Sequence, residues 1–314
     1  MTNNAKAKPV EILMVEDSPG DVRLAKEFFR DADVAIQLHV AEDGIEAMDF
    51  LLREGAHTAA PRPDLILLDL NLPRMDGREV LANIKQNETL KNIPTIILTT
   101  SEAEEDILKS YQLHANCYVS KPVQLEAFES VMQNISDFWL TKIRFPGLLS
   151  RKVSAHEENY WRNVMPVEIL MVEDSPGDVR LTRELFQDAD VAVKLHVAED
   201  GVEAMAFLRQ EGVHANAPRP DLILLDLNLP RMDGREVLAN IKQNESLKTI
   251  PTIILTTSEA EADIIKSYQL QANCYLSKPV QLDAFEGIVR SISDFWLTKV
   301  KFPSRGKSDE KWIE

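Results

Sequence analysis

The feature that most constrains the fold of this chain is a duplication at an offset of 157 residues. Residues 9–146 align without gaps on residues 166–303, and 27 of the 138 aligned positions differ. Residues 60–88 recur unchanged as residues 217–245. Solenoid repeats are about 20–50 residues long, so two copies of this length exclude a solenoid and indicate two copies of one whole domain.

The alignment predicts a first domain over residues 9–146, a linker over 147–164, a second domain over 165–303 and a tail over 304–314. The linker is neither Gly/Ser-rich nor Pro-rich, so its composition does not predict its stiffness. Within it, Tyr160 and Trp161 either pack on a neighbouring domain or belong to a partly ordered tail. Met165 opens the second copy where the first has Lys8, which suggests that two stand-alone units were joined.

Within each copy, short apolar runs alternate with amphipathic segments. In the first copy we predict strands over residues 11–15, 36–40, 65–68, 95–98 and 117–119, and helices over about 19–32, 43–54, 77–87, 102–113 and 124–142. Ser18 and Ser101 are predicted helix caps, and Asp76-Gly77 a turn that starts a helix. Five successive strand–helix units predict an α/β domain with a doubly wound parallel sheet.

Polar residues follow the predicted strands at their carboxyl ends, where ligands bind in such folds. Glu16-Asp17 follows the first strand, Asp69 the third, Thr99 the fourth and Lys121 the fifth. Three carboxylates at one edge repel each other and stay ionised together only with a cation, and oxygen ligands suit Mg²⁺. One carboxylate can then act as a nucleophile and form an aspartyl phosphate, which an ammonium and a hydroxyl stabilise.

These residues and their spacing resemble the receiver domains of two-component response regulators. The motifs that carry the resemblance are Val15-Glu16-Asp17, LDLNLPRMDG over residues 68–77, Leu98-Thr99-Thr100, and Tyr118 followed by Lys121-Pro122. The resemblance extends over nearly all of both copies, and the motifs follow one another in the order and at the spacing typical of the family. The resemblance implies two flavodoxin-like (βα)5 domains with the parallel sheet order 2-1-3-4-5.

The resemblance also implies that Asp69 accepts a phosphoryl group in a Mg²⁺-dependent reaction. The other roles that it implies in the first copy are metal binding by Asp17, Asp69, the Asn71 carbonyl and, through water, Glu16; contacts to phosphoryl oxygens from Thr99 and Lys121; and a rotamer change in Tyr118 on activation. Glu16 departs from the pattern, because many members have Asp there. The equivalent residues of the second copy are Glu173, Asp174, Asp226, Asn228, Thr256, Tyr275 and Lys278.

Two further motifs indicate a subfamily and a partner. DSPGDVRL over residues 17–24 and DFWLTK over residues 137–142 resemble the small response regulators partnered with cyanobacterial phytochromes. The resemblance implies a phytochrome-type histidine kinase as the phosphoryl donor in a phosphorelay. Residues 304–314 are too few for an output module, so we expect signalling by protein–protein contact or onward transfer.

The last predicted helix carries more apolar residues than one buried stripe needs. Leu125, Phe128, Met132, Ile135 and Trp139 form a 3-4-3-4 pattern that covers the sheet. Phe138 and its equivalent Phe295 lie off that stripe and indicate a partner surface. By resemblance, the face of the fourth and fifth helices and fifth strand is the candidate for receiver–receiver pairing, within the chain or as a homodimer.

Two other functional classes compete with a receiver pair. A Mg²⁺-dependent phosphatase of the haloacid dehalogenase type also uses an aspartyl nucleophile, but it needs an aspartate two residues later, where Asn71 and Asn228 stand here. A phosphorylation-independent scaffold is disfavoured because both pockets are complete. We therefore expect a signalling domain and not an enzyme.

Composition narrows the partners and the location. The net charge is −16, from 51 acidic and 35 basic residues, and no Lys/Arg-rich stretch offers a nucleic-acid surface. The start of the chain has no apolar segment of a leader, and no apolar run approaches the length of a membrane span. Cys117 and Cys274 lie at equivalent positions, and we expect both to be buried and reduced. These features predict a cytoplasmic protein with no membrane contact.

Overall fold

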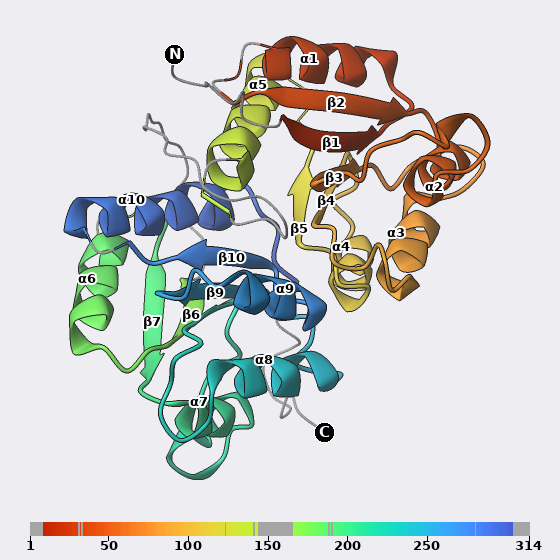
Figure 1. Ribbon diagram of the computed structural model, residues 1–314. Helices are drawn as coiled ribbons and strands as arrows, with labels where there is room; N and C mark the ends of the chain where they lie inside the picture. The colour runs from red at the N-terminus through yellow and green to blue at the C-terminus, as the bar shows by residue number, and fades with distance from the viewer. Residues whose placement is uncertain are drawn as a thin grey trace, which may run out of the picture.

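The computed structural model describes residues 9–30, 32, 34–122, 124–140, 142–143, 166–187, 189, 191–279 and 281–303. Within them lie two five-stranded parallel sheets, and along each sheet the strands of that copy are ordered second, first, third, fourth, fifth. The predicted doubly wound α/β domains are confirmed, with the predicted strand order in each copy (Figure 1). The proposed linker and tail lie outside the described residues, and the exact domain bounds remain a prediction.

The bounds of the elements follow the predicted pattern closely. The first domain consists of β1 (Val10–Val15), α1 (Pro19–Arg30), β2 (Ile36–Ala41), α2 (Gly44–Leu52), a 3₁₀ turn (Gly55–His57), β3 (Leu65–Leu68), α3 (Gly77–Gln86), β4 (Thr95–Thr99), α4 (Glu104–Gln112), β5 (Cys117–Ser120), α5 (Leu125–Ile135) and η2, a π-helical turn (Ser136–Leu140).

The second domain repeats this order. It consists of β6 (Val167–Val172), α6 (Pro176–Gln187), β7 (Val193–Ala198), α7 (Gly201–Leu208), a 3₁₀ turn (Gly212–His214), β8 (Leu222–Leu225), α8 (Gly234–Gln243), β9 (Thr252–Thr256), α9 (Glu261–Gln269), β10 (Cys274–Ser277), α10 (Leu282–Ile292) and η4, a π-helical turn (Ser293–Leu297). Among the described helices, none has the length and apolarity that a bilayer span requires.

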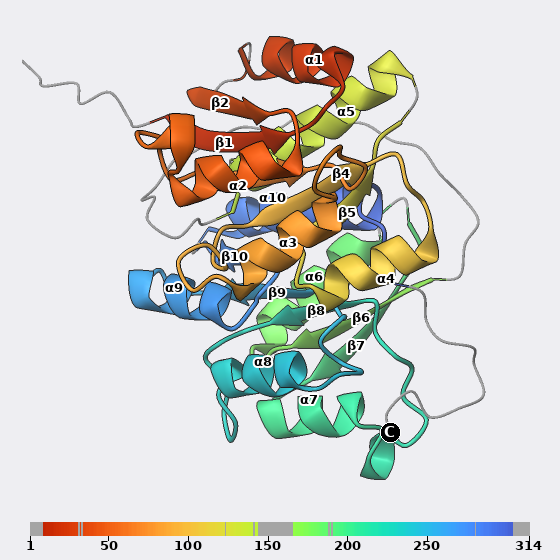
Figure 2. The same cartoon turned by 90° about the vertical axis from the view of Figure 1, so that its right-hand side faces the viewer.

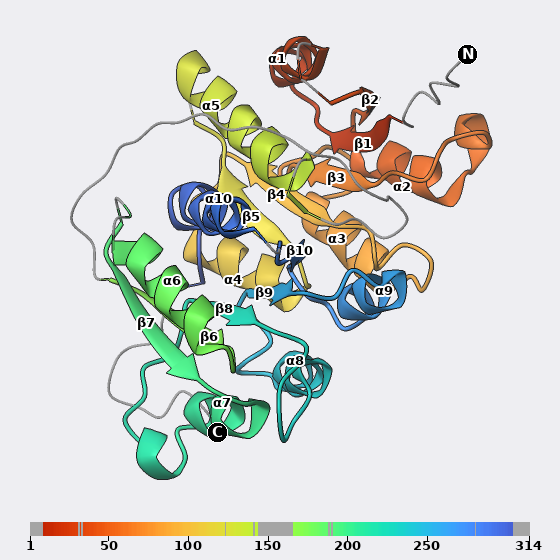
Figure 3. The same cartoon turned by 60° about the vertical axis from the view of Figure 1, so that its left-hand side comes forward.

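Each sheet is covered on both faces, which explains its continuous apolar strands. All residues of β1, β3 and β4 are buried. Helices α1 and α5 lie on one side of the first sheet, and α2 and α3 lie on the other (Figure 3). The strands are parallel, so the carboxyl ends of β1, β3, β4 and β5 open at one edge.

Two of the predicted helix starts are confirmed and one is wrong. Asp21 N donates to Ser18 Oγ at 3.3 Å, and Arg78 N donates to the Asp76 carboxylate at 2.7 Å, as N-caps do. Ser101 was the expected cap of the fourth helix, but α4 begins at Glu104 without a side-chain cap. The Ser101 hydroxyl instead donates to Asp106 Oδ2 at 2.6 Å, which holds the preceding loop outside the helix.

The last helix is also not the uniform α-helix expected over residues 124–142. It changes to a π-helical turn at Ser136, where Ile143 N donates to Phe138 O at 3.2 Å, five residues back. The wider turn buries both Phe138 and Trp139, although they are neighbours in sequence. The two rings lie edge to face, with centroids 6.1 Å apart.

The two domains contact each other along β5, β10 and the helices that follow them (Figures 1 and 2). The Phe138 and Phe295 rings stack across this contact, with centroids 4.9 Å apart and planes 13° apart. These are the two aromatics that the sequence placed off the core stripe. Buried, free Cys117 and Cys274 lie in β5 and β10, as predicted.

A segment of the second domain also runs beside the outer edge of the first sheet. Val300 forms an antiparallel bridge with Val119 of β5. Lys301 N donates to Tyr118 O at 2.8 Å, and the Tyr111 hydroxyl donates to Lys301 O at 3.0 Å. The edge strand of the first sheet is therefore partly covered by backbone from the second copy.

Candidate functional site

A buried lysine lies at the carboxyl edge of the first sheet, between carboxylates from three elements. Lys121, which follows β5, has its Nζ 2.5 Å from Asp69 Oδ2, after β3. The same ammonium contacts the Glu16 carboxylate after β1 and lies 3.1 Å from Asp21 Oδ2 in α1. Asp69 and Lys121 are 5% and 7% exposed, so this charge cluster is screened poorly by solvent.

The second copy repeats this arrangement. Lys278 Nζ lies 2.7 Å from Asp226 Oδ2 and 3.0 Å from Asp178 Oδ2, and it contacts the Glu173 carboxylate. Both pockets therefore place a single ammonium against three carboxyl groups. The pairing of Asp21 and Asp178 with the lysines was missed from the sequence, because both lie in the first turn of a helix and not at the end of a strand.

The pKa values of the carboxyl groups and the lysine show that negative charge exceeds positive charge in each pocket. Burial raises the pKa of Glu16 to about 7; Lys121 opposes this rise, and the nearby Asp69 charge adds to it. Burial also raises the pKa of Glu173. Burial disfavours the Lys121 ammonium, but the Glu16 and Asp69 carboxylates outweigh it and raise the pKa of Lys121. Each pocket thus has more carboxyl groups than its lysine can neutralise.

The backbone around Asp69 fixes the direction of its side chain. Asn71 N donates to Asp69 Oδ1 at 3.0 Å, so both carboxylate oxygens have partners. A Cβ on Gly77 would lie 2.0 Å from Asp69 O, and Gly77 N donates to Leu70 O at 3.0 Å. Glycine is required at the start of α3, because any side chain there would push the helix away from the Asp69 loop.

The predicted threonine lies beside the aspartate. Thr99 ends β4 and is fully buried, and its Oγ1 accepts a hydrogen bond from Asn71 Nδ2 at 3.4 Å. In the second copy the pKa of Asp226 is lowered: burial works against this, but Lys278 and hydrogen bonds, one of them from Thr256, outweigh it. A hydroxyl, an ammonium and a carboxylate therefore share one edge of each sheet.

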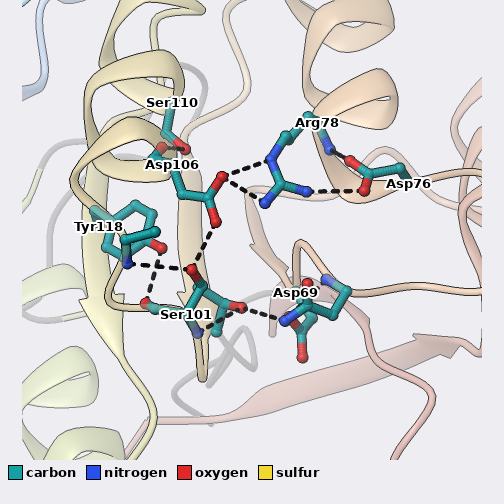
Figure 4. Close-up of polar contacts among 10 residues, drawn as sticks. Asp69, Asp76, Arg78, Ser101, Asp106, Ser110 and Tyr118 are labelled. Carbon is teal, nitrogen blue, oxygen red and sulfur yellow. Dashed lines mark hydrogen bonds and ion pairs between the residues drawn. The ribbon is translucent and has the colours of Figure 1, made fainter.

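The predicted switch residue belongs to a polar network that joins the pocket edge to two helices (Figure 4). The Tyr118 hydroxyl donates to Ser101 O at 2.9 Å, and the Ser101 hydroxyl donates to Asp106 in α4. Arg78 at the start of α3 bonds Asp106 through Nε at 3.0 Å and Asp76 through Nη1 at 2.8 Å. Burial raises the pKa of Tyr118 to about 12, so its hydroxyl keeps its proton.

Three of the predicted metal-binding residues of the first copy are joined by direct contacts: Glu16 and Asp69 share Lys121, and Asn71 N bonds Asp69. Asp17 and its equivalent Asp174 are exposed. Over the described parts of the chain, no group of three or more His, Cys, Asp or Glu residues is arranged to hold a metal ion. The donor set nevertheless fits Mg²⁺ in chemistry, since surplus carboxylate oxygens at one edge are the ligands that hard cations take.

Fold and site together define a protein of two α/β domains, each with an aspartate–lysine pocket at the carboxyl edge of a parallel sheet. The chain belongs to the response regulator receiver domain family, which matches residues 12–133 and 169–290. The tandem duplication and the two-component assignment made from the motifs are thereby confirmed.

Individual relatives align with one copy at a time or with both. Response regulator Rcp1 of Synechocystis sp. is 52% identical over 139 residues, which is 44% of this chain and 95% of Rcp1. Response regulator PleD of Caulobacter vibrioides is 23% identical over 277 residues, which is 86% of this chain and 56% of PleD. A structure of the phosphorylated cyanobacterial phytochrome response regulator RcpA is 46% identical, covers 45% of this chain and all of its own, and has a TM-score of 0.44.

Proposed function

We propose that this chain is a tandem phosphoacceptor of two-component signalling, which takes phosphoryl groups from a histidine kinase onto Asp69 and Asp226. The observation that carries the proposal is the buried contact between an aspartate and a lysine at the sheet edge, present once in each copy. A buried carboxylate with fixed oxygens is a preorganised nucleophile, and a buried ammonium is a preorganised site for phosphoryl oxygens.

The reaction follows from these groups. A carboxylate oxygen of Asp69 attacks the phosphorus of a phosphohistidine, the new O–P bond forms, and the P–N bond breaks. The imidazole nitrogen keeps the electron pair of the broken bond and later takes a proton from water. Lys121 and the Thr99 hydroxyl bind the phosphoryl oxygens as negative charge gathers there.

Receiver domains bind Mg²⁺, and we assign that ion to the same edge in each copy. The residues that would hold it are Glu16 (through water), Asp17, Asp69 and the Asn71 carbonyl, with Glu173, Asp174, Asp226 and Asn228 in the second copy. When bound, the ion supplies positive charge to the phosphoryl oxygens. Lys121 contacts both Glu16 and Asp69, so the ammonium would share these carboxylates with the bound ion.

The donor that we assign is a phytochrome-type histidine kinase. The support comes from the DSPGDVRL and DFWLTK motifs, each present in both copies, and from the similarity to Rcp1. The chain then signals by protein contact or by onward phosphorelay. The rival phosphatase would need an aspartate as general acid two residues after the nucleophile. Asn71 stands at that position, and its amide cannot act as an acid; it donates a hydrogen bond to Thr99 Oγ1.

The test is phosphate stoichiometry. Incubation with acetyl phosphate and Mg²⁺, or with a phosphorylated phytochrome-type kinase, should give about two hydroxylamine-sensitive phosphates per chain. Steady turnover of p-nitrophenyl phosphate would instead support the phosphatase, and absence of any label would support the scaffold. Ranking transfer rates from several phosphorylated kinases tests the choice of donor separately.

A further inference from the structure

Two buried asparagines face each other where the domains meet. Asn116 and Asn273 directly precede β5 and β10, and each is 4% exposed. Asn116 Nδ2 donates to Asn273 O at 2.8 Å, and Asn273 Nδ2 donates to Asn116 O at 2.9 Å and to Ala115 O at 3.3 Å. Each side-chain amide therefore bonds the backbone of the other domain.

The orientation of each amide is fixed from inside its own domain. Asn116 Oδ1 accepts from Thr95 N at 2.8 Å and from Lys85 Nζ at 3.2 Å. A reversed amide would place its NH₂ group against two donors, so Nδ2 must point to the partner domain. The equivalent contacts to Asn273 Oδ1 come from Thr252 N at 2.8 Å and Lys242 Nζ at 3.0 Å.

The lysine behind each asparagine strengthens this constraint. Lys85 Nζ also donates to Ile93 O at 3.0 Å and to Lys91 O at 3.4 Å, so its three acceptors are neutral oxygens. Asn116 Oδ1 therefore stays engaged inside its own domain, and the one group that Asn116 offers across the contact is an N–H donor.

We propose that Asn116 and Asn273 select the pairing partner: this face accepts a receiver domain that presents an amide donor and a backbone carbonyl at the same place, which here is the other copy. Stacked rings such as Phe138 and Phe295 tolerate sliding, whereas these short, reciprocal bonds hold in one register only. A buried hydrogen bond adds little net stability when made and costs much when its partner is missing, so it discriminates more than it attracts. A buried asparagine sets the register of coiled coils for the same reason.

The test measures docking in the full-length chain. Arg23 and Arg180 lie in equivalent exposed positions of α1 and α6. Spin labels at Arg23→Cys and Arg180→Cys should give one narrow distance, and burial raises the pKa of Cys117 and Cys274, which protects them from labelling. Asn116→Asp keeps the acceptor for Thr95 N and Lys85 but opposes the Asn273 carbonyl with a carboxylate. We expect part of the signal to move from the narrow distance to a broad distribution from undocked chains, and the same for Asn273→Asp.

Asn83→Asp is the matched control, because Asn83 lies exposed on α3, the helix that carries Lys85. It should leave the distance unchanged. Circular dichroism and urea unfolding show whether each variant is folded. A narrow, unshifted distance in folded Asn116→Asp overturns the proposal. If that variant unfolds, Asn116→Ser replaces it, and an unshifted distance there has the same consequence.

Discussion

The two pockets of this chain match each other much more closely than its two docking helices do. Residues 60–88, which include Asp69 and the start of α3, recur unchanged in the second copy. In α5 and α10, by contrast, five consecutive positions differ, residues 130–134 against 287–291. Each pocket must satisfy the same chemistry by itself, whereas a docking helix must only fit its partner.

The sequence difference between α5 and α10 produces a contact that has no equivalent in the other copy. Lys299 Nζ donates to Ser130 Oγ at 3.3 Å, and the position equivalent to Ser130 is Gly287, which has no hydroxyl to offer. The pair is thus a pseudo-dimer whose halves can be told apart. Substitutions at equivalent positions of the two copies therefore distinguish the properties of the shared pockets from those of the asymmetric contact.

The largest effect should come from the phosphoacceptors. Asp69→Asn and Asp226→Asn should each halve the phosphate incorporated from acetyl phosphate, because both pockets hold the same aspartate–lysine contact. The double substitution should remove the label. Hydroxylamine-sensitive phosphate counted per chain is the measurement, and full label on one single variant would show that the two pockets are not equivalent.

The next effect concerns the metal. Asp17→Ala should reduce Mg²⁺-dependent labelling of Asp69 by more than about tenfold and leave Asp226 unaffected, with the reverse for Asp174→Ala. Mass spectrometry of phosphopeptides distinguishes the sites. Glu42→Ala removes an exposed carboxylate after β2 and serves as the control. Labelling that survives chelation in all variants contradicts the assignment.

A smaller effect should appear in the dependence of stability on pH. Burial lowers the pKa of Lys85 and Lys242 from 10.5 to about 7. Between pH 7 and 10.5 the unfolded chain binds protons that the folded chain does not, so stability should rise with pH, by up to about 1.4 kcal/mol per pH unit for each lysine. Urea unfolding from pH 7 to 9.5 checks this. Lys85→Met should remove the slope of the first domain only; an unchanged slope rejects the explanation.

The smallest effect should come from the asymmetric contact. Ser130→Gly removes the bond to Lys299 and places glycine inside α5, at a cost of roughly 1 kcal/mol. Gly287→Ser should stabilise by somewhat less than that, since no atom lies within 4 Å of a Cβ built there. Thermal unfolding should shift by a few degrees in opposite directions. A loss of stability in Gly287→Ser would show that α10 requires the glycine.

The sequence predicted the fold well because each element carries its own local signal. The buried strands appear as unbroken apolar runs, and Asp76-Gly77 marks the start of α3. The start of α4 was placed wrongly because Ser101 has two possible partners, and only the folded chain brings Asp106 close enough to decide between them. The π-helical turn at Ser136 has no comparable local signal.

The site was predicted to a similar extent. Asp69, Thr99 and Lys121 end neighbouring strands, so their meeting follows from topology. Asp21 was missed as a partner of Lys121, although its position at the start of α1 places it beside the end of β1. Contacts between the copies, such as Tyr118 with Lys301, depend on how two surfaces meet, which residue spacing within one copy does not contain.

The placement of Val300 and Lys301 beside β5 has a consequence for how the protein is made. Ribosomes add roughly 5–20 residues per second, and domains fold in order as they emerge. The first domain is complete long before Lys301 is synthesised, so during translation its β5 edge is an open row of hydrogen-bonding groups. Among the residues that the structure describes, the segment that covers that edge is the last part of the second domain. Successive ribosomes on one mRNA therefore carry first domains whose β5 edges are uncovered. Two nascent chains can then pair through these edges before the second domain of either chain docks on its own first domain.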